Sequence, residues 1–189
     1  VAKLTDHWLH PKQGTDAALA FAFGHVILRE FHLDNPSQYF TDYCRQYSDM
    51  PMLVRLDPRE DGSFVTSRYL RASDLDGGLG EANNPEWKTL AFDENSGGLV
   101  VPHGSVGFRW GEKGRWNIEE RESQGRDTRL VLSLKDGHDG FVNVCFPYFG
   151  GVEHEGWTAS PREDILKRHI PTRKIMQADG TEVLVASVY

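Results

Sequence analysis

Cysteine is scarce in this sequence: the 189 residues include two, Cys44 and Cys145, which lie far apart. Neither belongs to a Cys-x-x-Cys pair, and two isolated thiols cannot build a disulfide framework or a four-thiolate metal site. We therefore expect both residues to be buried, reduced thiols of a folded domain.

Long apolar runs and an excess of positive charge are also missing. The longest apolar run, 17–28 (AALAFAFGHVIL), is shorter than the roughly 18 residues of a membrane span and contains His25. It indicates a buried core helix. The net charge of −7 disfavours nucleic-acid binding, which depends on clustered Lys and Arg, and leaves no basic patch for anionic lipid. We expect no nucleic-acid partner and no direct membrane insertion.

Motifs of common catalytic and metal centres are absent from the sequence. It has no Gly-x-Ser-x-Gly nucleophile turn, no His-Glu-x-x-His pair, no Gly-x-Gly-x-x-Gly loop and no Walker sequence. Its eight His residues are scattered, without the carboxylates or thiols in register that a metal site requires. The sequence therefore gives no support for a nucleophilic catalytic residue and disfavours a histidine metal site.

The front third of the chain is predicted to be helical. A loop containing Gly14 ends at Thr15, which suits a helix N-cap, and Asp16 falls in the first turn, where negative charge is favoured. The helix is expected to run to about Phe31. Because 17–23 is apolar all round, this helix should be buried on several sides.

A second helix is predicted to end before Pro51. Asn35 suits its N-cap, Pro36 its first position and Gln38 a capping-box contact. Its aromatic stripe indicates core packing and comprises Tyr39, Phe40, Tyr43, Cys44 and Tyr47.

After Asp57 the sequence becomes richer in Gly, Asp and Asn, and its apolar segments shorten. The predicted strands are MLVRL, SFVTSRYL, WKTLAFDE, GLVVP, VGFRWG, TRLVLSL and FVNVCFPYF. RKIMQ and EVLVASVY flank the turn ADGT and predict a hairpin, whereas SPREDILKRHI, opened by Ser160 and Pro161, predicts a short helix. The expected fold class is α/β or α+β, with a helical front third and a β-rich remainder.

The stretch HPKQGTDAAL, residues 10–19, is the candidate binding site. Gly14 permits a sharp turn, and the backbone N–H groups at the helix start that follows can bind an anion. The carboxylate of Asp16 could accept from the adjacent N1–H and N2–H donors of a guanine. Two interpretations stay open: a purine-nucleotide site, and a simple Thr15–Asp16 helix cap, which the pattern alone favours because such caps are common.

The segment LTDHWLHPKQGTDAAL resembles the molybdopterin oxidoreductase family, and HVILREFHLDNPSQYFTDYCRQYSDMPML resembles the helix pair that follows it there. NNPEWKT, GSVGFRWGEKGRWN and FPYFGG further resemble the alpha, or catalytic, subunits of the membrane-bound respiratory nitrate reductases. The resemblance covers essentially the whole chain. Since the sequence begins at Val1, we expect an internal fragment of a much larger subunit.

The resemblance implies an activity and a cofactor. Such subunits reduce nitrate to nitrite with a molybdenum bis(molybdopterin guanine dinucleotide) cofactor. Electrons come from quinol through iron–sulfur clusters, a beta subunit and a membrane gamma subunit, at the cytoplasmic face of the bacterial inner membrane. By the same resemblance, Gln13, Gly14, Thr15 and Asp16 would hold one guanosine end of the cofactor, with Asp16 accepting from guanine.

The resemblance also implies how the chain divides. Residues 1–56 would belong to the cofactor-binding, dinucleotide-fold region, and 57–189 would be a β-rich insertion that packs against the subunit or its partner. The family's molybdenum and cluster ligands lie N-terminal to this region, so the fragment alone should be inactive and need not hold any cofactor. It should expose apolar surface and associate. The alternative is a stand-alone, non-catalytic binding module.

Overall fold

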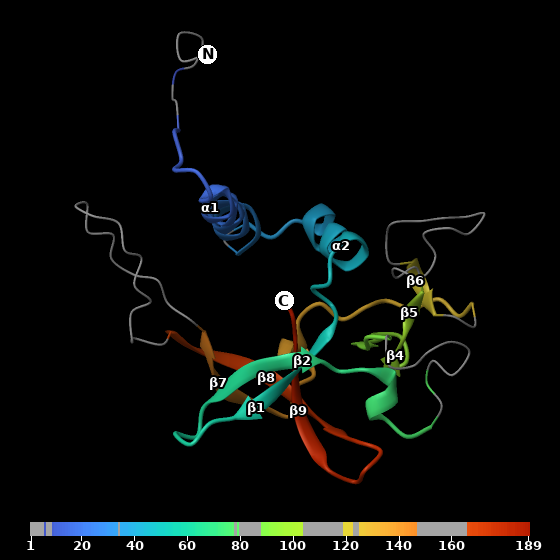
Figure 1. Ribbon diagram of the computed structural model, residues 1–189. Helices are drawn as coiled ribbons and strands as arrows, with labels where there is room; N and C mark the ends of the chain where they lie inside the picture. Colours follow the sequence, from blue (N-terminus) through green and yellow to red (C-terminus); the bar gives the residue numbers. More distant parts are fainter. Residues whose placement is uncertain are drawn as a thin grey trace. The chain divides into compact units, whose positions relative to one another are not determined.

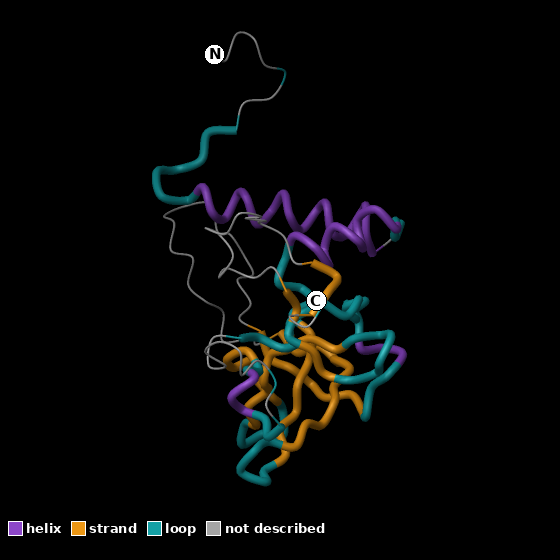
Figure 2. Tube along the Cα trace, turned by 90° about the vertical axis from the view of Figure 1, so that its right-hand side faces the viewer, coloured by secondary structure: helices purple, strands orange, loops and turns teal. Residues whose placement is uncertain are grey.

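The structure is a computed structural model in which residues 6, 9–33, 35–77, 79, 88–103, 119–122, 125–146 and 166–189 are described (Figure 1). The chain forms two compact units, Val1–Asp42 and Tyr43–Tyr189. Helices dominate the first unit and strands the second (Figure 2), which confirms an α+β composition with its helices at the front. The roles assigned to 1–56 and 57–189 stay predictions.

Helix α1, Asp16–Leu28, forms the body of the first unit and continues into a π-helical turn, Arg29–Leu33. Its start and length agree with the sequence, because its Ala and Leu residues are strong helix formers and outweigh the single Gly24. Its burial does not agree: α1 has no buried residue within the described part of the chain. An apolar helix becomes a core helix only where another layer covers it, and the described residues of the first unit supply no such layer.

Helix α2, Gln38–Tyr47, spans the boundary between the two units. Its N-terminal cap is Ser37, whose hydroxyl accepts from the backbone N–H of Phe40 at 3.2 Å. The predicted cap, Asn35, instead donates its side-chain amide to the carbonyl of Glu30 at 2.9 Å. Asn35 was the wrong cap because Ser37 offers an equally good acceptor closer to the first turn.

The aromatic stripe of α2 is only partly a core element. Cys44 is buried, whereas Tyr39, Tyr43 and Tyr47 are exposed, Tyr39 to 80%. Both cysteines of the chain are free and buried, as their scarcity and isolation suggested.

The second unit is built on a closed barrel of five strands in the order β1-β2-β7-β8-β9 (Figure 1). Its strands are β1 (Leu53–Pro58), β2 (Phe64–Tyr69), β7 (Gly140–Phe146), β8 (Leu166–Met176) and β9 (Glu182–Ser187). The β2–β7 pair is parallel and the other four pairs are antiparallel. Closure gives each of these strands two neighbours and removes the open sheet edge.

Shorter elements accompany the barrel. These are the pair β3 (Ala91–Phe92) and β4 (Leu99–Val100), the pair β5 (Pro102–His103) and β6 (Glu119–Glu122), and two 3-10 turns, Ala72–Asp74 and Leu134–Asp136.

Two apolar clusters use opposite faces of the barrel strands. One draws on all five strands and contains Leu56, Val144 and Ala186 with Phe64, Val142, Phe146, Ile170 and Leu184. The other joins Leu53, Ile175, Val183 and Val185 to the segments outside the barrel, through Leu70, Ala72, Leu90, Phe92, Val101 and Leu134. Side chains of a strand alternate between its faces, so each strand can serve both clusters. The unit therefore carries its own core.

The sequence analysis misassigned two segments of this unit. SPREDILKRHI was expected to be a helix, but its described residues 166–170 lie in β8, where Lys167 pairs with Cys145 of β7. The pairing partner, distant in sequence, overrides a helical local pattern. TRLVLSL makes one isolated bridge, Asp93 with Leu130, and leads into a 3-10 turn. VGFRWG lies outside the described residues.

Candidate functional site

The predicted binding turn is a tight turn between Lys12 and Thr15. The backbone N–H of Thr15 donates to the carbonyl of Lys12 at 3.0 Å, and the Thr15 hydroxyl donates to the same oxygen at 2.6 Å. Gly14 inside the turn has φ of +84°, in the left-handed region where a side chain would be strained. The turn therefore needs glycine at this position.

The Thr15 hydroxyl faces back into this turn and does not cap the helix. Thr15 stands at the N-cap position of α1, but its side chain makes no capping hydrogen bond to the helix. Its carbonyl accepts from Ala18 at 3.1 Å and from Leu19 at 3.3 Å. By helix geometry, the N–H groups of Asp16 and Ala17 then have no carbonyl partner within α1. The interpretation of Thr15–Asp16 as a side-chain cap is thus wrong for Thr15.

The residues around these N–H groups are exposed, so a ligand could reach them. Gln13, Gly14, Thr15 and Asp16 are all exposed, and a Cβ built on Gly14 would meet no atom within 4 Å. The structure thus brings together a bare stretch of backbone, two helix N–H donors and the two acceptor oxygens of Asp16. This combination suits a group with a flat face, adjacent N–H donors and a nearby negative charge, so the residues present fit a guanine nucleotide.

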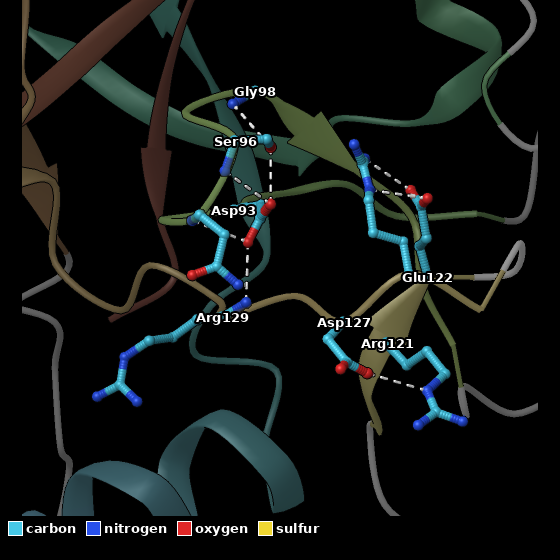
Figure 3. Close-up of polar contacts among 9 residues, drawn as sticks. Asp93, Ser96, Gly98, Arg121, Glu122, Asp127 and Arg129 are labelled. Carbon is cyan, nitrogen blue, oxygen red and sulfur yellow. Dashed lines mark hydrogen bonds and ion pairs between the residues drawn. The ribbon is translucent and has the colours of Figure 1, made fainter.

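Asp93 is a buried carboxylate held by several hydrogen bonds (Figure 3). It is 1% exposed and follows β3. It accepts from the backbone N–H of Arg129 at 2.8 Å, from the N–H and hydroxyl of Ser96 at 3.0 and 2.7 Å, and from the N–H of Asn95 at 3.2 Å. All of its acceptor positions are taken by the protein, so it joins two loops and has none left for a ligand.

The pKa of Asp93 follows from these contacts. Burial alone would raise it, but the hydroxyl of Ser96 and the backbone N–H groups of Arg129, Asn95 and Ser96 outweigh burial and lower the pKa below its ordinary value. The neighbouring Glu94 is exposed and pairs with Arg129 at 2.9 Å. The sequence analysis did not single out Asp93, although a local signal for its turn is present. The signal was the spacing of Asp93 to Ser96 and Gly97, typical of an Asx-type turn.

Two ion pairs lie nearby: the first is exposed on both sides, and in the second the Glu122 carboxylate is mostly covered. Arg121 meets Asp127 at 3.3 Å (Figure 3). Arg126 meets Glu122 at 2.9 Å. Among the described residues, no group of three or more His, Cys, Asp or Glu side chains is arranged to hold a metal ion. Within the same residues, none of the helices combines the length and apolar character that crossing a bilayer demands.

Comparison with known proteins gives strong matches along the entire chain. No family model matches it. It is 58% identical over 189 residues to the respiratory nitrate reductase 2 alpha chain of Escherichia coli (strain K12) and 56% identical over 190 aligned positions to the respiratory nitrate reductase 1 alpha chain of the same strain. In both cases all of this chain and 15% of the relative are covered.

A more distant relative gives the same result. The respiratory nitrate reductase alpha chain of a Bradyrhizobium species is 43% identical over 187 residues, which cover 99% of this chain and 17% of the relative. The chain thus spans about one sixth of the length of the curated relatives that it matches. Over that span, it belongs to the family of the nitrate reductase alpha chains.

Proposed function

We propose that this chain acts as a segment of the catalytic alpha subunit of a respiratory nitrate reductase, an oxidoreductase that reduces nitrate to nitrite. The observation that carries the proposal is the 58% and 56% identity to such alpha chains along all of its residues. The complete enzyme would take electrons from quinol through iron–sulfur clusters, with a beta subunit and a membrane gamma subunit as partners. It would work at the cytoplasmic face of the bacterial inner membrane.

Within that subunit, the segment's own task is to hold cofactor. The family's molybdenum bis(molybdopterin guanine dinucleotide) supplies the redox chemistry when bound. We propose that Asp16 accepts the N1–H and N2–H donors of one guanine with its two carboxylate oxygens. Gly14 and Thr15 would offer bare backbone to the nucleotide and Gln13 a polar side chain at its edge. We assign no residue of this segment a role in the reduction of nitrate itself.

The fit of the turn supports this role. The Thr15 hydroxyl donates to the carbonyl of Lys12, so it makes no capping hydrogen bond at the start of α1. Gly14 has no side chain, and the space where one would lie is open to a nucleotide. A helix start without a side-chain cap attracts an anionic group such as a nucleotide phosphate. Residues 57–189 would contribute a β-rich packing region.

The test is Asp16→Ala in the complete reductase, with molybdenum and releasable guanine nucleotide measured per alpha chain. Hydrogen bonds to a charged group contribute about 1.5–3 kcal/mol, so cofactor retention should weaken by roughly 10- to 100-fold. The Asp16→Asn enzyme, which keeps one acceptor oxygen, should retain an amount of cofactor between those of the parent and the Asp16→Ala enzyme.

Glu30→Ala is the matched control, because it removes another exposed carboxylate from the same helical segment. It should leave cofactor content unchanged. Full cofactor occupancy in the Asp16→Ala enzyme would rule out the role given to Asp16.

A further inference from the structure

The five strand pairs of the barrel differ in length, and the β2–β7 pair is the shortest. It consists of two residue pairs, Phe64 with Val144 and Val65 with Cys145. β7 and β8 share seven residue pairs, and the other three strand pairs have four each. The β2–β7 pair is also the parallel one, at the place where the barrel closes (Figure 1). Parallel pairing is slightly less stable per residue than antiparallel pairing, so this is the weakest ladder of the barrel.

The core of the unit also holds these two strands less firmly than the others. Every residue of β2 is at least partly exposed. The larger apolar cluster, around Val185, draws on β1, β8 and β9, and none of its described members lies on β2 or β7. Separation of β2 from β7 would therefore disturb the smaller cluster, around Val144, and leave the larger one in place. Regions with few buried contacts open at the lowest free energy.

A chain of polar side chains connects the strands at this place. The Cys145 thiol, on β7, donates to the Ser63 hydroxyl at 3.1 Å. That hydroxyl, directly before β2, donates in turn to the carboxylate of Asp61. Lys167, on β8, donates to the other oxygen of Asp61 at 2.9 Å. Ser63 and Cys145 are buried, whereas the Asp61 carboxylate is exposed. These bonds join the β1–β2 turn to both β7 and β8.

Asp61 is the residue on which the other three depend. Its carboxylate also accepts from the backbone N–H of Ser63 at 3.0 Å, which fixes the turn before β2. The Ser63 hydroxyl and the Lys167 ammonium hold the pKa of Asp61 well below its usual range, so the carboxylate is ionised at neutral pH. Without it, the buried Ser63 hydroxyl would lose the acceptor for its proton. An unpaired buried donor favours any state in which water reaches it.

We propose that β2 can separate from β7 while the rest of the strand-rich unit stays folded, and that Asp61 keeps the two strands together. Loss of the Asp61 carboxylate releases Ser63 and Lys167 at once, so the β2–β7 pair loses its side-chain support. Separation exposes the Cys145 thiol, while the cluster around Val185 holds β1, β8 and β9 in place. The proposal concerns the strand-rich unit alone and does not depend on the cofactor role given to Asp16.

The experiment measures how fast the Cys145 thiol reacts in the full-length alpha chain. Folded protein is treated with N-ethylmaleimide, and the modification is quantified by mass spectrometry on the peptide that contains Cys145, so other thiols do not contribute. Asp61→Ala removes the carboxylate. Glu182→Ala is the matched control, because it breaks the exposed ion pair with Lys174, which has the same 2.9 Å separation but joins β8 to β9.

We expect Asp61→Ala to raise the reaction rate of Cys145 by at least about tenfold, because hydrogen bonds to a charged group are lost only in the closed state. Glu182→Ala should change the rate by less than about twofold, because exposed ion pairs contribute little and this one lies at another strand pair. An unchanged rate in Asp61→Ala, or an equal rise in both variants, would overturn the proposal.

Hydrogen exchange of the unmodified alpha chain tests the opening without any substitution. The backbone amides of 64–65 and 144–145 should exchange faster than those of 182–187 in β9. The Cys145 rate should depend only weakly on low concentrations of urea, because a local opening exposes little surface. Equal exchange in these strands, or a steep rise of the Cys145 rate with urea, would mean that the thiol is reached only by unfolding of the whole unit. Either result would refute the separate opening of β2 and β7.

Discussion

The two units of this chain use similar side chains in opposite ways. In the strand-rich unit, Phe92 is 4% exposed and packs in a cluster formed by strands and loops of the same unit. In the helical unit, Phe21 is 80% exposed and α1 has no buried residue. Hydrophobicity therefore does not decide burial by itself. The barrel strands find their partners within this chain, and the partners of α1 are expected elsewhere in the alpha chain.

The largest expected difference in unfolding free energy is between two variants of the isolated chain, each of which removes one phenylalanine ring from one of the two units. Phe92→Ala takes away a buried ring over which the guanidinium of Arg173 lies at 4.2 Å, and should lower the free energy of unfolding by about 3–5 kcal/mol. Phe21→Ala should change it by less than about 0.5 kcal/mol, because the ring is already in water. Urea unfolding followed by circular dichroism measures both.

Equal losses of unfolding free energy in these two variants would contradict the contrast between the two units. They would mean that α1 is packed even in the isolated chain. A loss for Phe21→Ala that appears only in the full-length alpha chain would instead sharpen the comparison, since it would locate the missing layer in the longer polypeptide.

A second, smaller effect concerns the buried carboxylate of the strand-rich unit. Asp93→Asn turns one acceptor oxygen into a donor facing N–H and hydroxyl donors, which should cost about 2–3 kcal/mol of stability. Glu94→Gln is the matched control, because it breaks the exposed pair with Arg129 and should cost less than about 1 kcal/mol.

The pH dependence of this effect has a definite sign. Since the native pKa of Asp93 is lowered, its ionised form favours the folded state. That contribution is complete above the unfolded-state pKa of roughly 4 and is lost as the pH falls through the lower native pKa. Acid titration of the unfolding free energy should therefore show a steeper loss for the parent chain than for Asp93→Asn. Parallel curves would contradict the assignment.

Local signals in the sequence predicted part of this structure. The turn ADGT correctly placed the hairpin of β8 and β9, since its residues 178–181 determine the turn locally. The start of α1 at Asp16 followed from its flanking residues. By contrast, the parallel pairing of Phe64 with Val144 joins residues that are far apart in the chain, and no local pattern encodes it.

The candidate site shows the same division between local and distant information. The turn at Gly14 and the exposed carboxylate of Asp16 are local features, and sequence reasoning placed both. It missed that Thr15 bonds back to Lys12, because a hydroxyl at a helix start can bond either way and only the backbone geometry selects one. Asp93 was missed because its burial depends on Arg129, from a distant loop.

The smallest expected change in stability concerns Tyr69. Its titration tests whether the strand-rich unit keeps its native contacts without the rest of the alpha chain. The hydroxyl of Tyr69, on β2, donates to the carboxylate of Asp49. That hydrogen bond, with burial and the nearby negative charge, raises the pKa of Tyr69 to about 12. A raised pKa stabilises the fold below the unfolded-state value of about 10, and the stabilisation is lost as the pH rises toward the native value.

Ultraviolet titration of tyrosinate, with Tyr69→Phe subtracted, should show Tyr69 ionising near the raised value in the isolated chain, and Asp49→Asn should lower it. The stability change in Tyr69→Phe should be below about 1 kcal/mol, because the ring is 37% exposed and the pair is solvated. A value near 12 in the isolated chain would show that these contacts form without the remaining polypeptide. A raised pKa found only in the full-length chain would mean that the strand-rich unit, like α1, depends on sequence outside these residues.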